Sequence, residues 1–289
     1  METRTATAAF DRAIAVAPAG DGRWTGVVDP DWAAPMGPNG GYLAAIVVRA
    51  LEAELDPRGE RRLRSLTCHY LRRPAEGPIE LEVEEVRSGR RLTSARISAR
   101  QDGREVLAAI AALSVPDLPD VATWAPEPPA VDPPPGQVEG RRRGRGWLDW
   151  NELMPPLMRQ VRFAPRIGGG IFSGHPIEPG RAPEVGGWIQ LAEPRGIDTA
   201  LVALCTDVWW PPSLSVLTRP AGAPTIDLTI HFRADLPREP LPDQPLLGRF
   251  QTAAAAGGLI EEDGALFTAD GTLLAQSRQL ALFTAFDAL

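Results

Sequence analysis

Two segments of the chain carry apolar residues at the spacing of an α-helix. The apolar stripe of the first segment, which follows Asn39-Gly40-Gly41, consists of Leu43, Ile46, Val47, Ala50, Leu51 and Leu55. The stripe of the second, which follows Gly196, consists of Ile197, Ala200, Leu201 and Leu204. Proline cannot continue the hydrogen-bond ladder, so Trp209-Trp210-Pro211-Pro212 ends the second segment. Each segment therefore predicts a glycine-led helix of about three turns.

Alternating apolar and polar residues, the pattern of β-strands, follow each predicted helix. After the first helix, the predicted strands span residues 64–70, 79–87, 92–101 and 106–114. After the second helix, they span residues 225–232, 246–255, 258–268 and 273–283. Shorter strand-like pieces lie near Val161 and at 186–190. An Asp-Gly turn precedes the last strand of each set, at 102–103 and at 270–271.

The two sets of elements are an internal repeat. The sequence LTCHY at 66–70 matches LTIHF at 228–232, and QDG at 101–103 matches ADG at 269–271. One helix followed by an antiparallel meander, twice, predicts an α+β architecture. We expect an N-terminal domain at 1–117, a proline- and arginine-rich linker at 118–157 and a C-terminal domain at 158–289.

Composition narrows the class of protein. The 289 residues are 44% hydrophobic, and the net charge of -7 argues against nucleic acid as the main partner. Cys68 and Cys205 form neither a disulfide framework nor a metal-ligand spacing, which fits a reducing compartment. The separation of His69, His175 and His231 predicts no metal site. The first residues lack a basic stretch before a long apolar core, so we expect no signal peptide, no membrane partner and a cytoplasmic location.

Four stretches carry a resemblance to a known family. They are NGGYLAAIVVRAL at 39–51, CTDVWWPP at 205–212, APTIDLTIHFR at 223–233 and LLAQSRQLALF at 273–283. With the duplicated order of helix and strands, they make the whole chain resemble the double hot-dog acyl-CoA thioesterases of the thioesterase II type. The resemblance implies a duplicated hot-dog fold, in which each half is an antiparallel sheet wrapped around one long helix. It also implies a role in lipid metabolism, acyl-CoA as a small-molecule substrate, and no cofactor besides the CoA of that substrate.

The same resemblance implies three catalytic residues, Asp207, Thr225 and Gln279. In such a site, Asp207 could deprotonate a water molecule or attack the thioester directly, while Thr225 and Gln279 hold the water. Each residue also has a structural interpretation. Asp207 could be a solvated carboxylate at the end of a helix, and Gln279 could lie in an interface. Strict alternation places Thr225 on the face opposite Leu228, so only an irregular strand start would turn it toward the helix.

The predicted substrate-binding residues are Asn39, Gly40, Gly41, Trp209 and Trp210. Backbone N–H groups at the glycine-led helix start could bind the thioester oxygen, although Asn39-Gly40-Gly41 could also be only a turn and a helix cap. Trp209 and Trp210 could narrow the pocket. These five residues are therefore candidates for contacts with the substrate.

Other charged positions have a structural interpretation beside a functional one. The arginine-rich stretch at 141–146 could contact the phosphates of CoA, or it could be a solvated loop. Glu52 is the rough counterpart of Asp207 in the first half, and we expect it to be exposed. His69 and His231 occupy equivalent repeat positions, which favours a structural role for both.

The favoured function is hydrolysis of an acyl thioester to a free acid and CoA. One alternative is a hot-dog hydratase or dehydratase acting on an enoyl or hydroxyacyl thioester, a chemistry that usually pairs the carboxylate with a nearby histidine. No histidine follows Asp207 in Val208-Trp209-Trp210-Pro211-Pro212. The other alternative is a non-catalytic protein that binds acyl thioesters. Because hot-dog pairs often associate further through their sheets, we also expect a homo-oligomer.

Overall fold

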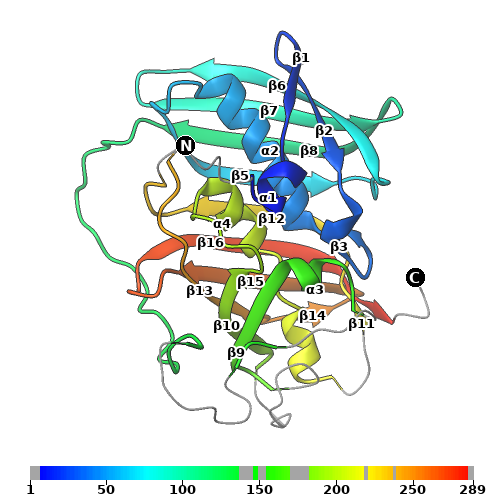
Figure 1. The fold of residues 1–289 in the computed structure, drawn as a ribbon, viewed down its shortest axis with the longest axis vertical. Helices are drawn as coiled ribbons and strands as arrows, with labels where there is room; N and C mark the ends of the chain where they lie inside the picture. Colours follow the sequence, from blue (N-terminus) through cyan, green and yellow to red (C-terminus); the bar gives the residue numbers. More distant parts are fainter. Residues whose placement is uncertain are drawn as a thin grey trace, which may run out of the picture.

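The computed structural model describes residues 7–136, 146–148, 154–169, 182–217, 221–236 and 239–285 (Figure 1). His175 and most of the arginine-rich stretch at 141–146 lie outside the described residues. The N-terminal half consists of α1 (Ala9–Ala13), β1 (Ala17–Gly20), β2 (Arg23–Val28), β3 (Ala33–Ala34), β4 (Gly37–Pro38), α2 (Gly40–Leu55), β5 (Arg62–Tyr70), β6 (Gly77–Ser88), β7 (Leu92–Gln101) and β8 (Arg104–Ser114).

The second half repeats this order with additions. It consists of α3 (Leu157–Gln160), β9 (Val161–Ile167), β10 (Glu184–Leu191), α4 (Thr199–Cys205), β11 (Ala221–Gly222), β12 (Thr225–Phe232), β13 (Leu246–Gln251), β14 (Ala255–Ala256), β15 (Leu259–Phe267), β16 (Leu273–Leu282) and β17 (Thr284–Ala285). Short 3-10 helices span Pro30–Trp32 and Pro212–Ser215. The eight strands predicted after the two helices are all present. The strand predicted at 246–255 is shorter than expected, because β13 ends at Gln251.

One continuous antiparallel sheet joins the two halves. Its strand order is β1-β2-β6-β7-β8-β5-β12-β16-β15-β13-β10-β9, and β14 pairs with β15. The halves meet where β5 pairs with β12, so the repeated sequences LTCHY and LTIHF lie side by side. Thr67 and Thr229 are partners in this register, and their Oγ1 atoms are 3.0 Å apart. Equivalent residues pairing across the seam give the molecule an approximate two-fold symmetry. The expected domain boundaries at 117 and 157 stay a prediction.

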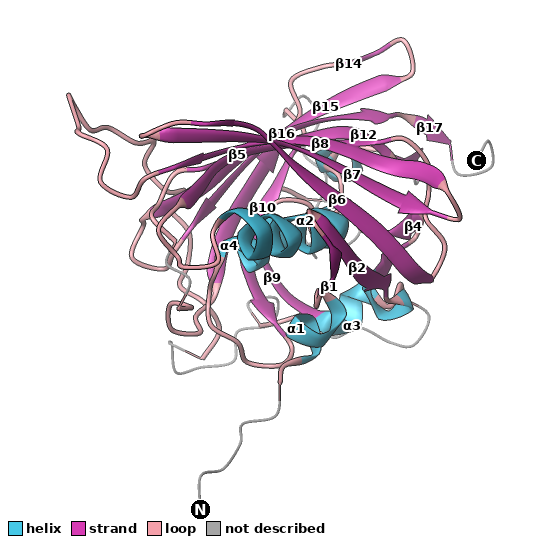
Figure 2. Cartoon of the chain, turned by 90° about the horizontal axis from the view of Figure 1, so that it is seen from above, coloured by secondary structure: helices cyan, strands magenta, loops and turns pink. Residues whose placement is uncertain are grey.

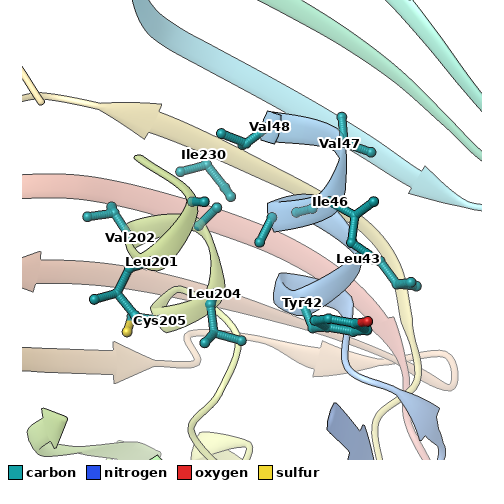
Figure 3. Close-up of a cluster of buried hydrophobic side chains, with 14 of the residues drawn as sticks. Tyr42, Leu43, Ile46, Val47, Val48, Leu201, Val202, Leu204, Cys205 and Ile230 are labelled. Atoms are coloured by element: carbon teal, nitrogen blue, oxygen red, sulfur yellow. The ribbon is translucent and has the colours of Figure 1, made fainter. Parts of the chain in front are cut away.

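Helices α2 and α4 lie side by side on the same face of the sheet (Figure 2). Their apolar side chains and Ile230 of β12 form a buried cluster (Figure 3). Backbones approach closely here, because a Cβ atom on Gly41 would lie 2.6 Å from the carbonyl oxygen of Leu204. The α+β fold expected from the sequence, with each half of the sheet packed on one helix, is therefore confirmed. Among the described residues, no helix is long and apolar enough to cross a membrane.

Helix α4 is shorter than predicted. It has 7 residues and ends at Cys205, whereas the pattern predicted a helix of three turns that contained Asp207 near its end. The hydroxyl of Thr206 donates to the carbonyl oxygen of Ala203 at 2.8 Å, and the N–H of Asp207 turns back to Leu204 at 3.1 Å. These bonds close the last turn, so Asp207 lies beyond the helix, where its side chain is free to reach α2.

Candidate active site

A cavity of about 560 Å³ lies where the two halves meet. It is enclosed by the start of α2, the end of β5, the loop after α4, the start of β12, and strands β15 and β16. Most of the residues that line the cavity are apolar. They include Leu43, Leu157, Met158, Trp210, Leu214 and Ile226. The charged side chains among the described lining residues are Asp207, Glu262, Arg72 and Arg73. An apolar cavity with a few charged groups has the character of a small-molecule site.

The carboxylate of Asp207 is held by the N-terminal end of α2. Its Oδ2 atom accepts a hydrogen bond from the backbone N–H of Gly41 at 2.9 Å and another from Asn39 Nδ2 at 3.1 Å. Asn39 Nδ2 also donates to the backbone carbonyl of Asp207 at 2.7 Å. The positive end of the α2 dipole favours a negative charge at this position. Asp207 is therefore neither a solvated helix-end residue nor part of its own helix; the opposite half of the molecule orients it.

The environment of Asp207 makes it a better base than an ordinary carboxylate. Burial raises the pKa of Asp207 from 3.8 to about 6, although the hydrogen bonds that it accepts oppose this rise. Asp207 keeps a small exposed area, and it lines the cavity. A carboxylate with a pKa of about 6 is still ionised at pH 7, and it holds a proton more strongly than a solvated aspartate does.

Thr225 and Gln279 meet beside Asp207. Thr225 Oγ1 donates to Gln279 Oε1 at 2.8 Å, and the side chain of Gln279 also hydrogen-bonds to Asp207. The pairing of β12 with β16 shifts by one residue between Thr225 and Asp227. This bulge turns Thr225 to the same face of the sheet as Gln279, although strict alternation would place it on the other face. The three residues expected to be catalytic therefore all line one cavity.

A fourth polar residue, Glu262, belongs to this group and was missed in the sequence analysis. It lies on β15 directly opposite Gln279, and its Oε1 atom accepts a hydrogen bond from Gln279 Nε2 at 2.9 Å. The signal was present in the sequence, because alternation along this strand places Glu262 on the buried face with Ile260, Gly264 and Leu266. Burial raises the pKa of Glu262 from 4.5 to about 8; the hydrogen bond from Gln279 opposes this rise, and the charge of Asp207 adds to it.

The backbone N–H groups at the start of α2 bind a residue of the protein rather than pointing into the cavity, which the sequence did not suggest. The expected donors to the thioester oxygen were the N–H groups of Gly40 and Gly41, but both donate to Asp207 here. Asn39 does cap the helix, since its Oδ1 atom accepts from the N–H of Tyr42 at 2.9 Å. The hydroxyl of Tyr70 donates to the carbonyl of Gly40 at 2.7 Å. The cap and the glycines thus build the support for Asp207.

Trp209 and Trp210 are buried and line the cavity. Their ring centroids are 4.7 Å apart, and both pack against Phe163 of β9, at 5.2 Å and 5.9 Å. Rings packed in this way form one rigid side of the cavity next to Asp207. The expectation that the two residues limit the space for a bound group stays a prediction.

The remaining charged candidates lie elsewhere. His69 and His231 are exposed, and neither is among the residues lining the cavity. The expectation that Glu52 is exposed was wrong: its side chain is partly buried and forms an ion pair with Arg49 at 3.2 Å. Burial raises the pKa of Glu52, and Arg49 opposes the rise. Glu52 therefore belongs to the contact between the helices.

The fold and the cavity define a double hot-dog protein, and solved structures agree. A hot-dog protein of unknown function from Alicyclobacillus acidocaldarius superposes with a TM-score of 0.81 at 25% identity, covering 96% of this chain and 99% of that one. A putative thioesterase II from Thermobifida fusca has a TM-score of 0.78 at 26% identity, covering 96% and 98%. An acyl-CoA thioesterase II from Mycobacterium marinum has the same fold, with a TM-score of 0.69, 20% identity, and coverage of 97% and 100%.

Sequence comparison gives the family. The family described as the acyl-CoA thioesterase N-terminal domain matches residues 28–114, and the acyl-CoA thioesterase C-terminal domain matches residues 120–283. The chain therefore belongs to the acyl-CoA thioesterase family. An uncharacterized protein of Mycobacterium tuberculosis is 25% identical over 287 residues, which cover 90% of each chain.

Proposed function

We propose that the protein hydrolyses an acyl-CoA thioester to a free acid and CoA. The observation that carries this proposal is the carboxylate of Asp207, which lies in a largely apolar cavity beside Thr225 and Gln279. Burial strengthens the carboxylate as a base, and the apolar lining suits an acyl chain. Membership in the acyl-CoA thioesterase family supports the same reaction class.

The hydrogen bonds suggest how a water molecule is held. Thr225 donates its hydroxyl proton to Gln279 Oε1, so the lone pairs of Thr225 Oγ1 remain to accept from water. A water that donates one proton to Thr225 and the other to Asp207 directs its own lone pair at the thioester carbon. Asp207 takes the proton as the carbon–oxygen bond forms, and the tetrahedral intermediate then expels the thiolate of CoA. General-base help of this kind contributes roughly 10²–10⁴-fold in rate.

The charges of the cavity suggest where the CoA part lies. Arg72 and Arg73 follow Tyr70 at the end of β5, are exposed, and line the cavity. Arg72 donates to the backbone carbonyl of Glu105 at 2.7 Å, and neither arginine has a carboxylate partner among the described residues. Guanidinium groups bind phosphate oxygens in pairs, so both remain available for the phosphates of CoA. The acyl chain would then occupy the apolar interior, with Asp207 between the two parts.

The experiment is release of free thiol from acyl-CoAs of short, long and aryl type, by the wild type and by Asp207→Asn. We expect a preferred acyl length, and a loss of kcat of about 10²-fold or more in the variant. Asp227→Asn, the same change on β12 outside the cavity lining, is the matched control and should keep wild-type kcat. Unchanged turnover in Asp207→Asn would remove Asp207 from the reaction. Binding of acyl-CoA without any thiol release would favour a non-catalytic binding protein. A cytoplasmic location and a homo-oligomer stay predictions.

A further inference from the structure

The carboxyl group of Glu262 lines the cavity, but it has no role in the hydrolysis proposed above, which involves Asp207, Thr225 and Gln279. It lies on the face of β15 that packs toward the helices, opposite Gln279 on β16. Its Oε1 atom accepts from Gln279 Nε2 at 2.9 Å, and no described residue donates to its Oε2 atom. A carboxyl group in such a position needs a reason, because removing it from bulk water is costly.

The amide of Gln279 can be turned in two ways, and its neighbours select one. An ionised carboxylate such as Asp207 only accepts hydrogen bonds, a protonated carboxyl group still accepts through its carbonyl oxygen, and a hydroxyl can donate or accept. With Asp207 and Glu262 on one side and Thr225 on the other, the NH₂ group must face the carboxyl groups. Its oxygen then faces Thr225 and accepts the hydroxyl proton. Without Glu262, one N–H of the amide loses its acceptor, and the preference for this orientation weakens.

We propose that Glu262 is a positioning residue for thioester hydrolysis, which fixes the amide of Gln279 and through it the hydroxyl of Thr225. This inference rests on the proposed function. Glu262 does not touch the reacting atoms; it determines which atom of Gln279 faces Thr225. If the amide turned over, its NH₂ group would donate to Thr225 Oγ1 and occupy the lone pair that the water needs. Catalysis would fall, while the acyl cavity would keep its shape.

If Glu262 has this role, the rate of hydrolysis should depend on whether Glu262 is protonated. The charged groups near it are Asp207 from the loop after α4, and Glu261 and Asp263 on its own strand; β12 and β16 contribute the uncharged Thr225 and Gln279. With a pKa of about 8, Glu262 is protonated at neutral pH, while Asp207, with a pKa of about 6, is ionised. Above about pH 8, Glu262 is ionised and adds a second negative charge to the cavity beside Asp207, which opposes the negative charge that develops on the thioester oxygen. The rate should therefore rise near pH 6 and fall again near pH 8.

The test compares kcat and KM from pH 5 to pH 9 in the wild type, Glu262→Gln and Glu262→Leu. Glutamine keeps an acceptor for Gln279 but cannot ionise, so we expect near wild-type kcat at pH 7 and no decrease above pH 8. Leucine has no acceptor, so we expect kcat to fall about tenfold or more with little change in KM. Asp263→Asn is the neighbouring control for kcat at pH 7, because its side chain pairs with Arg278 outside the cavity; its charge also raises the pKa of Glu262, so it is not a control for the pH profile.

Two results would overturn the inference. One is a Glu262→Leu variant with wild-type kcat and pH profile, and the other is an alkaline decrease that persists in Glu262→Gln. If thermal unfolding shows that Glu262→Leu does not fold, the pH profile of kcat for Glu262→Gln alone tests the inference. Asp207→Asn, measured in the same series, separates this inference from the proposed function. An inactive Asp207→Asn with unaffected Glu262 variants would refute only the role of Glu262, whereas an active Asp207→Asn would refute the mechanism itself.

Discussion

The charge of Asp207 should destabilise the folded protein at neutral pH, even though the proposed reaction requires it. Folding raises the pKa of Asp207 from 3.8 to about 6 because the carboxyl group becomes buried. The folded state then binds this proton more tightly than the unfolded chain does. The contribution of Asp207 to stability is thus fully present below about pH 4 and is lost as the pH rises through 6. Replacing it with asparagine removes this dependence.

The rise in the pKa of Asp207 gives the size of this loss of stability. At about 1.4 kcal/mol for each pH unit, a rise from 3.8 to about 6 corresponds to about 3 kcal/mol at pH 7. Asparagine at this position keeps the size of the side chain, and its oxygen can still accept from Gly41. Its NH₂ group would face the donors of Asn39 and Gln279, which costs about 1–3 kcal/mol at every pH. This cost adds the same amount to the stability difference between the two proteins at every pH, so it does not affect how that difference changes with pH.

The measurement is the free energy of unfolding in urea at pH 4, 5, 6 and 7 for the wild type and Asp207→Asn. Between pH 4 and pH 7, the difference should move in favour of the variant by about 2 kcal/mol, because roughly a fifth of the total has already been lost at pH 4. Asp227→Asn is again the matched control for the same chemical change outside the cavity. The range stops at pH 7, because Glu262, with a pKa of about 8, begins to ionise above it.

A difference that stays constant from pH 4 to pH 7 would refute this reasoning, and so would one that moves in favour of the wild type. A constant difference would mean that water reaches the carboxylate of Asp207 freely, so the solvated helix-end interpretation would be correct for this residue. A difference that moves in favour of the wild type would mean that the hydrogen bonds to the carboxylate outweigh its burial and lower its pKa. The proposed base would lose the physical reason for its strength.

Three further predictions concern binding and stability. Changing Arg72 and Arg73 together to glutamine should raise KM for acyl-CoA about tenfold. KM for the matching acyl-pantetheine should not change, because this substrate has no phosphate. Equal effects on both substrates would refute phosphate binding by these arginines. Asp198→Ala should lower the free energy of unfolding by about 2–4 kcal/mol, because it removes the buried carboxylate that caps α4 and binds Arg49 and Arg195, which then keep only Asp11 and Glu52 as acidic partners among the described residues; urea unfolding tests this. Gly41→Ala should cost about 1–3 kcal/mol, because its Cβ would lie 2.6 Å from the carbonyl oxygen of Leu204; a more stable variant would contradict the close helix contact.

Much of the fold follows from local patterns. The stripe from Leu43 to Leu55 predicted α2, and alternation predicted every strand that builds the centre of the sheet. The repeat of LTCHY in LTIHF indicated the duplication, and the two segments turned out to pair across the seam. These features depend on the spacing of apolar residues along the chain, which a sequence displays directly.

The residues of the candidate site could be predicted from the sequence only in part. Asp207, Thr225 and Gln279 were identified through the family resemblance, and alternation argued against Thr225. The bulge between Thr225 and Asp227 reversed that argument, because one extra residue moves a side chain to the other face. Such a shift depends on the neighbouring strand, so no local pattern predicts it. Glu262, by contrast, was predictable as an acidic residue on a buried strand face.

The sequence by itself determined the elements of this protein, their duplication and the apolar faces that must be buried. Only the tertiary structure decided what each polar group does. Gly41 illustrates the difference, since the sequence indicated free N–H donors for a ligand and the fold gives them to Asp207, 166 residues away. Burial and hydrogen bonding depend on which distant segments come together. The ionisation of Asp207 and Glu262, and with it the chemistry of the cavity, is therefore a property of the folded chain.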